Sequence, residues 1–205
     1  MKIWLSDTGK RFNRDWIFRH LSCTFITGQS YAIVGPNGSG KSTLLQMIAG
    51  ALSPSEGKID WGSDDKKTDP DRVFAQVAIC APYLEVVEEM TATEFLAFHS
   101  SFKPFINGIS ITNILSIINL SDAAHKQIRY YSSGMKQRVK LAQAFFSDVP
   151  VLLLDEPCTN LDEAGYNLYY KLINEFAKNR LVIVSSNEEK EISFCRERIN
   201  ILDHR

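Results

Sequence analysis

Apolar residues along the chain form short continuous runs that alternate with longer segments of helical spacing. The runs typical of buried strands cover residues 30–34, 77–80, 151–154, 181–185 and 199–202. Helical spacing covers about residues 41–51, 132–146, 162–177 and 188–196. Strands without polar alternation, joined by helices, are typical of a mainly parallel sheet that is covered on both faces. The pattern therefore predicts an α/β fold.

The N-terminal part has a different pattern, which predicts an antiparallel sheet ahead of the parallel one. Residues 3–5 and 17–26 have the composition of strands, and the charged segment 8–11 between them predicts a turn. A further short strand is expected at 58–61, followed by a polar turn over 62–71. The charges of that turn indicate a solvated loop.

Residues from about 85 to 130 change character again. Helical apolar periodicity covers 93–102 and 109–120, and Pro104 and Gly108 separate the two segments. We interpret this stretch as a helical subdomain inserted into the α/β domain. The chain 1–205 is then one domain, in which 1–84 and 131–205 form the β-subdomain and the core.

Composition narrows the functional classes. The 205 residues carry a formal net charge of -1 and no basic run, so nothing favours a nucleic-acid ligand. The scattered Cys23, Cys80, Cys158 and Cys195 form no C-x-x-C pair, which predicts neither zinc nor disulfides and fits a reducing cytoplasm. No signal peptide and no apolar run of membrane-spanning length are present in the sequence.

One motif predicts a nucleotide site. It matches the phosphate-loop pattern G-x-x-x-x-G-K-[ST] and consists of Gly35, Pro36, Asn37, Gly38, Ser39, Gly40, Lys41, Ser42 and Thr43. Backbone N–H groups of such a loop bind phosphate oxygens, the lysine follows the β- and γ-phosphates, and the serine hydroxyl reaches Mg²⁺. A flexible glycine turn is the simpler interpretation of the motif alone. The expected strand before it and helix after it favour the nucleotide site instead.

Two carboxylates follow the expected strand 151–154. In an open α/β sheet, ligands bind beyond the carboxyl ends of the strands, where Asp155 and Glu156 emerge. Taken alone, an Asp-Glu pair at a strand end indicates a solvated turn. Beside a phosphate loop, Asp155 is placed to hold Mg²⁺ and Glu156 to activate water as a general base.

A third segment, Tyr131-Ser132-Ser133-Gly134-Met135, precedes a helix. Its serines are good N-caps, and the helix start is a second candidate site for anionic oxygens. The order of phosphate loop, helical insertion, Ser-x-Gly helix start and Leu-Leu-Leu-Asp-Glu-Pro resembles the ATP-binding subunit of ATP-binding cassette (ABC) transporters over nearly the whole chain.

The resemblance implies an α/β P-loop NTPase (RecA-like) core, ATP and Mg²⁺ as cofactors, and head-to-tail pairing of two cassettes as a homodimer or heterodimer. In this arrangement, Ser132, Ser133 and Gly134 touch the nucleotide of the partner cassette. Phe12 takes the place of the aromatic ring that stacks on adenine, with Trp16 as a second candidate and a core or surface role as the alternative for both. Integral-membrane permease subunits are the implied partners, which places the chain at the cytoplasmic face of a membrane.

The insertion also carries aromatic residues in the region where the family docks its membrane subunits. These residues are Phe95, Phe98, Phe102 and Phe105. For most of them, a role in the insertion's own core is the simpler interpretation. An exposed aromatic patch would mark the partner surface.

Three positions depart from the family pattern. Ser133 and Met135 replace a glycine and the glutamine of the signature, and Tyr83 stands where the family has a glutamine, with Glu85 as a substitute oxygen ligand. Asn187 replaces the switch histidine. Because an amide cannot carry the imidazolium charge, we expect slower turnover.

The resulting hypothesis is a stand-alone ABC-type ATPase subunit that drives a separately encoded permease, with no accessory domain after the cassette. The alternative is an ATP-gated dimerising switch with little or no hydrolysis, which the three departures motivate. The intact Lys41, Asp155 and Glu156 favour the ATPase.

Overall fold

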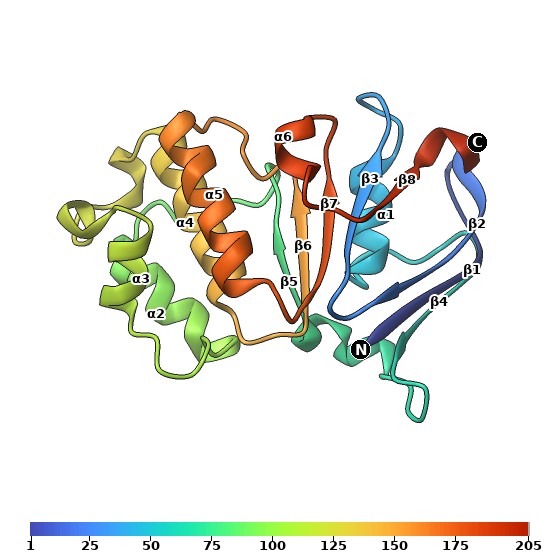
Figure 1. Ribbon diagram of the computed structural model, residues 1–205, viewed down its shortest axis with the longest axis horizontal. Helices are drawn as coiled ribbons and strands as arrows, with labels where there is room; N and C mark the ends of the chain where they lie inside the picture. Colours follow the sequence, from blue (N-terminus) through green and yellow to red (C-terminus); the bar gives the residue numbers. More distant parts are fainter. Residues whose placement is uncertain (205) are drawn as a thin grey trace. The chain divides into compact units, whose positions relative to one another are not determined.

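A five-stranded and a three-stranded sheet organise the computed structural model, which describes residues 1–204 (Figure 1). The chain divides into two compact units. The first comprises Met1–Ile79, Pro150–Asp155 and the residues from Asn179 on, and the second comprises Cys80–Val149 and Glu156–Lys178. Within residues 1–204, no helix has both the length and the apolar character needed to cross a membrane.

The larger sheet has the strand order β5-β6-β7-β3-β8. Its strands are β3 (Ser30–Val34), β5 (Val77–Cys80), β6 (Val151–Asp155), β7 (Leu181–Ser185) and β8 (Glu197–Asn200). The pairs β6/β7, β7/β3 and β3/β8 are parallel, which confirms the predicted mainly parallel sheet. The predicted bounds of β3, β5 and β7 coincide with the observed ones.

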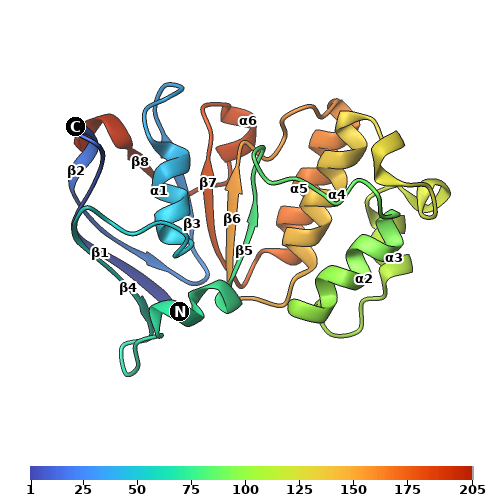
Figure 2. The ribbon, with the colours of Figure 1, turned by 180° about the vertical axis from the view of Figure 1, so that it is seen from behind.

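Helix α1 (Lys41–Ile48) covers the face of this sheet that Figure 2 presents. It packs against β6 and β7. Alternate strand residues join the apolar side of α1 in one core cluster: Tyr31, Ile33, Val151, Leu153, Leu181 and Ile183. Because side chains alternate between the faces of a strand, Asp155 and Ser185 also lie on the α1 face, at the carboxyl ends of β6 and β7.

The smaller, antiparallel sheet has the order β2-β1-β4, with β1 (Lys2–Phe12), β2 (Asp15–Ile26) and β4 (Glu56–Gly62). The turn predicted over residues 8–11 is wrong, because β1 continues through this segment with register shifts. Thr8 is fully buried there and its Oγ1 donates a hydrogen bond of 2.9 Å to the Lys58 carbonyl. The polar segment is therefore part of a bulged strand, and the chain reverses after Phe12.

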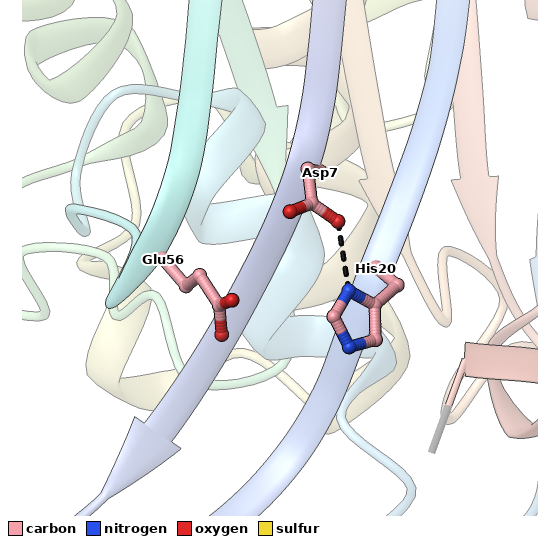
Figure 3. A group of neighbouring side chains, drawn as sticks. All are labelled: Asp7, His20 and Glu56. Atoms are coloured by element: carbon pink, nitrogen blue, oxygen red, sulfur yellow. Dashed lines mark hydrogen bonds and ion pairs between the residues drawn. The ribbon is translucent and has the colours of Figure 1, made fainter.

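A cluster of Asp7, His20 and Glu56 lies on one face of this sheet (Figure 3). The bulge gives Asp7 a φ of 48° and His20 a φ of 56°, and His20 Nδ1 lies 2.8 Å from Asp7 Oδ1. Glu56 pairs with Arg19, whose Nη2 lies 2.8 Å from the carboxylate. Each ionisable side chain of the cluster thus already has a partner on the sheet, which explains the cluster as structural pairing across three strands.

The second unit is helical and contains α2 (Ala92–Phe102), α3 (Ile111–Ile117), α4 (Ser133–Phe146) and α5 (Glu163–Phe176). Thr91 and Glu94 form a capping box that starts α2. Helix α2 packs on α3 and α4, and α4 packs on α5. The unit is larger than the insertion expected over residues 85–130, because α4 and α5 also belong to it. Short 3-10 helices η2 (Ser121–Ala123) and η3 (Ile128–Tyr130) precede α4.

Several element ends differ from the sequence expectation. Helix α1 stops at Ile48, and Gly50 takes a φ of 75° soon after it. The polar turn over 62–71 leads into a 3-10 helix, η1 (Pro70–Gln76), whose N-cap is Asp69. Near the C-terminus, α6 covers only Glu189–Ile192, and β8 starts two residues before the predicted strand 199–202 and ends at Asn200. The 3-10 helix η4 (Ile201–His204) follows β8.

Candidate nucleotide site

The predicted phosphate loop connects β3 to α1. Gly40 is the N-cap of α1 with a φ of 104°, and a Cβ at this position would overlap the Ile17 side chain. A Cβ on Gly35 would lie 2.8 Å from Ser39 Oγ. Because of these overlaps and the positive φ values, only glycine fits at these two points of the loop. The start of α1 adds the positive end of a helix dipole.

Lys41 is folded against this loop. It is 5% exposed, and its Nζ donates hydrogen bonds of 2.7 Å to the Gly35 carbonyl and 3.3 Å to the Pro36 carbonyl. An ammonium group has three donors, so one remains for a further acceptor. The loop carbonyls thus hold the lysine charge where the backbone curves around the candidate phosphate position.

Asp155 is the acidic group on the α1 face of the sheet. It is 2% exposed, and its Oδ1 has no hydrogen-bond partner among the residues that the structure describes. A buried carboxylate oxygen without a partner is costly unless a cation or water satisfies it. Ser42, the second residue of α1, adds a hydroxyl at the helix start. A carboxylate and a hydroxyl suit Mg²⁺, which is a hard cation that prefers oxygen ligands.

Glu156 follows Asp155 directly and has a left-handed backbone with a φ of 43°. Its carbonyl accepts a hydrogen bond of 3.1 Å from the Thr159 N–H, which closes the turn after β6. A left-handed conformation costs a non-glycine residue about 1–2 kcal/mol, and such residues cluster at functional sites. This backbone strain supports the choice of Glu156 as a candidate catalytic group.

Asn187 contacts the phosphate loop from the end of β7. Its Oδ1 accepts a hydrogen bond of 3.2 Å from the Gly35 N–H. Its Nδ2 donates a hydrogen bond of 3.3 Å to Asn37 Oδ1. The structure therefore brings Asn187 to the predicted nucleotide site, although 152 residues separate it from Gly35.

The two candidate adenine platforms differ in exposure. Phe12 is 47% exposed, and Lys10 Nζ lies 5.2 Å from its ring centroid. Trp16 is partly buried, and the guanidinium groups of Arg11 and Arg19 lie 5.5 Å and 4.2 Å from its ring. Phe12 is the more exposed ring and has one cation beside it rather than two, so it is the better candidate for stacking on a base.

The predicted signature segment starts α4. Ser132 is the N-cap and its Oγ accepts a hydrogen bond of 3.3 Å from the Met135 N–H, while Ser133 is exposed. A Cβ on Gly134 would lie 3.1 Å from the Asn160 carbonyl oxygen, which is closer than ordinary contact. The segment is thus a capped helix start that leaves the Ser133 side chain open to solvent.

Sequence reasoning did not identify Gln137, which is 3% exposed inside the helical unit. Its Nε2 donates a hydrogen bond of 2.7 Å to the Pro157 carbonyl and contacts Cys80 Sγ at 3.7 Å. Gln137 therefore fixes α4 to the turn that follows the acidic pair. In the sequence, the only indication of this role is that Gln137 falls on the apolar side of the helical pattern of α4.

The remaining sequence candidates lie on the surface of the helical unit or are reduced thiols. Tyr83 is 45% exposed, and Glu85 is also exposed. All four cysteines are in the thiol form. Burial raises the pKa of Cys23 and of Cys195 to about 12, so neither thiol is a ready nucleophile.

A phosphate loop between a parallel strand and a helix, with an acid at the end of another parallel strand of the same sheet, defines a P-loop nucleotide-binding protein. The family model described as ABC transporter matches residues 18–159. This chain therefore belongs to the ABC transporter family, as an ATP-binding subunit.

Curated relatives agree with this assignment. The chain is 38% identical over 185 residues to YxlF of Bacillus subtilis, described as an uncharacterized ABC transporter ATP-binding protein, and the match covers 87% of this chain and 60% of YxlF. It is 31% identical over 185 residues to the cytochrome c biogenesis ATP-binding export protein CcmA of Aliivibrio fischeri, covering 86% of this chain and 91% of CcmA. The chain thus spans less than two thirds of YxlF.

Solved structures support the fold. A structure from Pyrococcus furiosus, described as an ABC transporter ATP-binding protein, superposes with a TM-score of 0.82 at 22% identity and covers 100% of this chain and 99% of that one. A bacterial Atm1-family ABC exporter with ATP bound gives a TM-score of 0.80 at 22% identity, covering 98% of this chain and 37% of the exporter. At this identity, the likeness establishes the fold alone.

Proposed function

We propose that this chain binds MgATP at the phosphate loop, hydrolyses it, and drives transport through separate integral-membrane permease subunits. The observation that carries the proposal is the buried Asp155 Oδ1 without a partner, on the same face of the sheet as the start of α1. Membership in the ABC transporter family supports ATP as the nucleotide, and this carboxylate is the proposed ligand of the cation.

Each site residue has a proposed role. Ser42 and Asp155 hold Mg²⁺, which neutralises phosphate charge when bound. Lys41 donates its third N–H to a phosphate oxygen, and Glu156 takes a proton from the attacking water. Asn187 donates from its amide to the γ-phosphate, for which it gives up the 3.3 Å contact with Asn37. This contact is long and exposed, so its loss costs little.

The remaining parts of the proposal concern assembly. Residues 1–205 act as one nucleotide-binding cassette, which pairs head to tail with a second cassette so that Ser132, Ser133 and Gly134 complete the partner's site. Phe12 stacks on adenine. This head-to-tail arrangement follows from the family resemblance, and the capped, exposed start of α4 supports it.

An aromatic pair on α2 is the proposed contact with the permease. Phe98 is 49% exposed and Phe102 is 74% exposed, with their ring centroids 5.0 Å apart. By contrast, Phe95 is 5% exposed and belongs to the core, as the simpler interpretation predicted. Exposed adjacent aromatic rings favour a protein partner. The cassette would then lie at the cytoplasmic face of the membrane through this contact.

The test is MgATP turnover per chain across a protein dilution series, for the native protein, Glu156→Gln and the matched control Glu163→Gln. Glu163 is an exposed glutamate in the first turn of α5. We expect turnover that rises with concentration, falls at least about a hundredfold in Glu156→Gln, and persists in the control. ATP binding without turnover in the native chain would contradict hydrolysis by a homodimer and favour the ATP-gated switch.

A further inference from the structure

Ser185, the last residue of β7, carries a second unsatisfied buried oxygen beside the candidate cation site. It is fully buried, and its Oγ has no hydrogen-bond partner among residues 1–204. The residue is the register partner of Asp155 on β6 and of Ile33 on β3. Neighbouring register partners in a parallel sheet point to the same face, so the hydroxyl lies on the α1 face together with the Asp155 carboxylate.

The neighbouring serine, Ser186, does not share the unsatisfied hydroxyl of Ser185. Ser186 is also buried, at 1% exposure, but its Oγ accepts a hydrogen bond of 2.9 Å from the Glu188 N–H. That hydroxyl serves the turn after β7. A hydroxyl at position 185 without a partner costs about 1–3 kcal/mol relative to one that is satisfied. Alanine would avoid this cost, so the serine needs another explanation.

We infer that Ser185 is a positioning residue for the divalent cation, and this inference rests on the proposed function. Mg²⁺ keeps several of its waters in protein sites, and these waters need acceptors and donors in the surrounding protein. The Ser185 hydroxyl contacts a water of the cation's shell that also contacts Asp155. Both buried oxygens are then satisfied by the same occupant, and Ser185 orients the carboxylate without binding the cation itself.

The experiment measures the affinity for a fluorescent, non-hydrolysable ATP analogue, once with EDTA and once with excess Mg²⁺. The ratio of the two affinities reports how strongly the cation supports nucleotide binding. Ser185→Ala is expected to reduce this ratio about tenfold, as for other outer-shell partners of metals, without changing the affinity in EDTA. Ser185→Thr keeps the hydroxyl and restores most of the ratio. The melting temperature of Ser185→Ala without ligands is unchanged or higher, because a hydroxyl without a partner is removed.

The matched control is Ser186→Ala, which loses a turn hydrogen bond. It is expected to lower the melting temperature and leave the Mg²⁺ ratio as in the native chain. An unchanged ratio in Ser185→Ala, or an equal decrease in Ser186→Ala, overturns the role of Ser185. A native chain that binds the analogue equally with and without Mg²⁺ instead overturns the proposed cation site, and the role of Ser185 with it.

Discussion

Acidification is expected to destabilise the helical unit through His99 of α2. Its Nε2 lies 2.9 Å from the Ser147 hydroxyl, at the end of α4. Ser147 already donates its proton to the Gln143 carbonyl at 2.6 Å, so the imidazole Nε2–H must be the donor to Ser147. Burial, and secondly the charge of Lys103, lowers the pKa of His99 from 6.5 to about 4. The folded unit therefore holds a neutral imidazole.

The sign of the effect follows from linkage. In the unfolded chain, the imidazole takes up a proton as the pH falls below 6.5, whereas in the folded chain it remains neutral until about pH 4. The contribution of His99 to the free energy of unfolding therefore decreases as the pH falls from 6.5 towards 4, and it does not change with pH above 6.5. The full shift corresponds to an upper limit of about 3 kcal/mol. Because His99 is only half-buried, solvent screening reduces this to about 1–2 kcal/mol.

The assay is urea denaturation at pH 7.5 and pH 5, comparing the native chain, His99→Gln and the control His125→Gln. His125 is an exposed histidine of the same unit. The native chain and the control are expected to lose about 1 kcal/mol more stability than His99→Gln between the two pH values. Equal losses in the native chain and His99→Gln would refute the linkage argument.

Two further substitutions test the proposed phosphate contact of Asn187 and the packing at Gly134. Asn187→His is expected to raise ATP turnover about tenfold, because an imidazolium brings a charge to the proposed γ-phosphate position that the amide lacks; unchanged turnover would contradict the expectation that the amide slows hydrolysis. Gly134→Ala is expected to lack the gain of about 1 kcal/mol that glycine to alanine gives inside a helix. The new Cβ would lie 3.1 Å from the Asn160 carbonyl, and urea denaturation that shows the full gain would contradict this crowding.

The central sheet was predictable because each buried strand is an apolar run between turn residues. The bounds of β3 and β7 follow from this pattern alone. The antiparallel sheet was less predictable, since the register shifts of β1 place the polar Thr8 inside. Its hydroxyl is satisfied by the Lys58 carbonyl, 50 residues away. Secondary-structure propensity, which is a local property of the sequence, does not predict a hydrogen-bond partner at that distance along the chain.

The candidate site was predictable where its residues are consecutive. The phosphate loop and the acidic pair at Asp155 each occupy one short segment of sequence. The contact between Asn187 and Gly35 depends on β7 lying beside β3, and this adjacency is a property of the sheet order. Gln137 and Ser185 were missed because a glutamine in a helix and a serine at a strand end are ordinary residues until their burial is known.

The signature segment shows how geometry distinguishes two adjacent positions at which the family has glycine. This chain has serine at 133 and glycine at 134, where the ABC transporter family has two glycines. The Asn160 carbonyl approaches position 134, so the retained glycine serves packing within this chain. Ser133 is exposed, and its side chain meets no comparable obstacle. Under the proposed head-to-tail pairing, an effect of Ser133 on turnover would arise at the partner's nucleotide, and Ser133→Gly tests this contact without changing the contact of Gly134 with the Asn160 carbonyl.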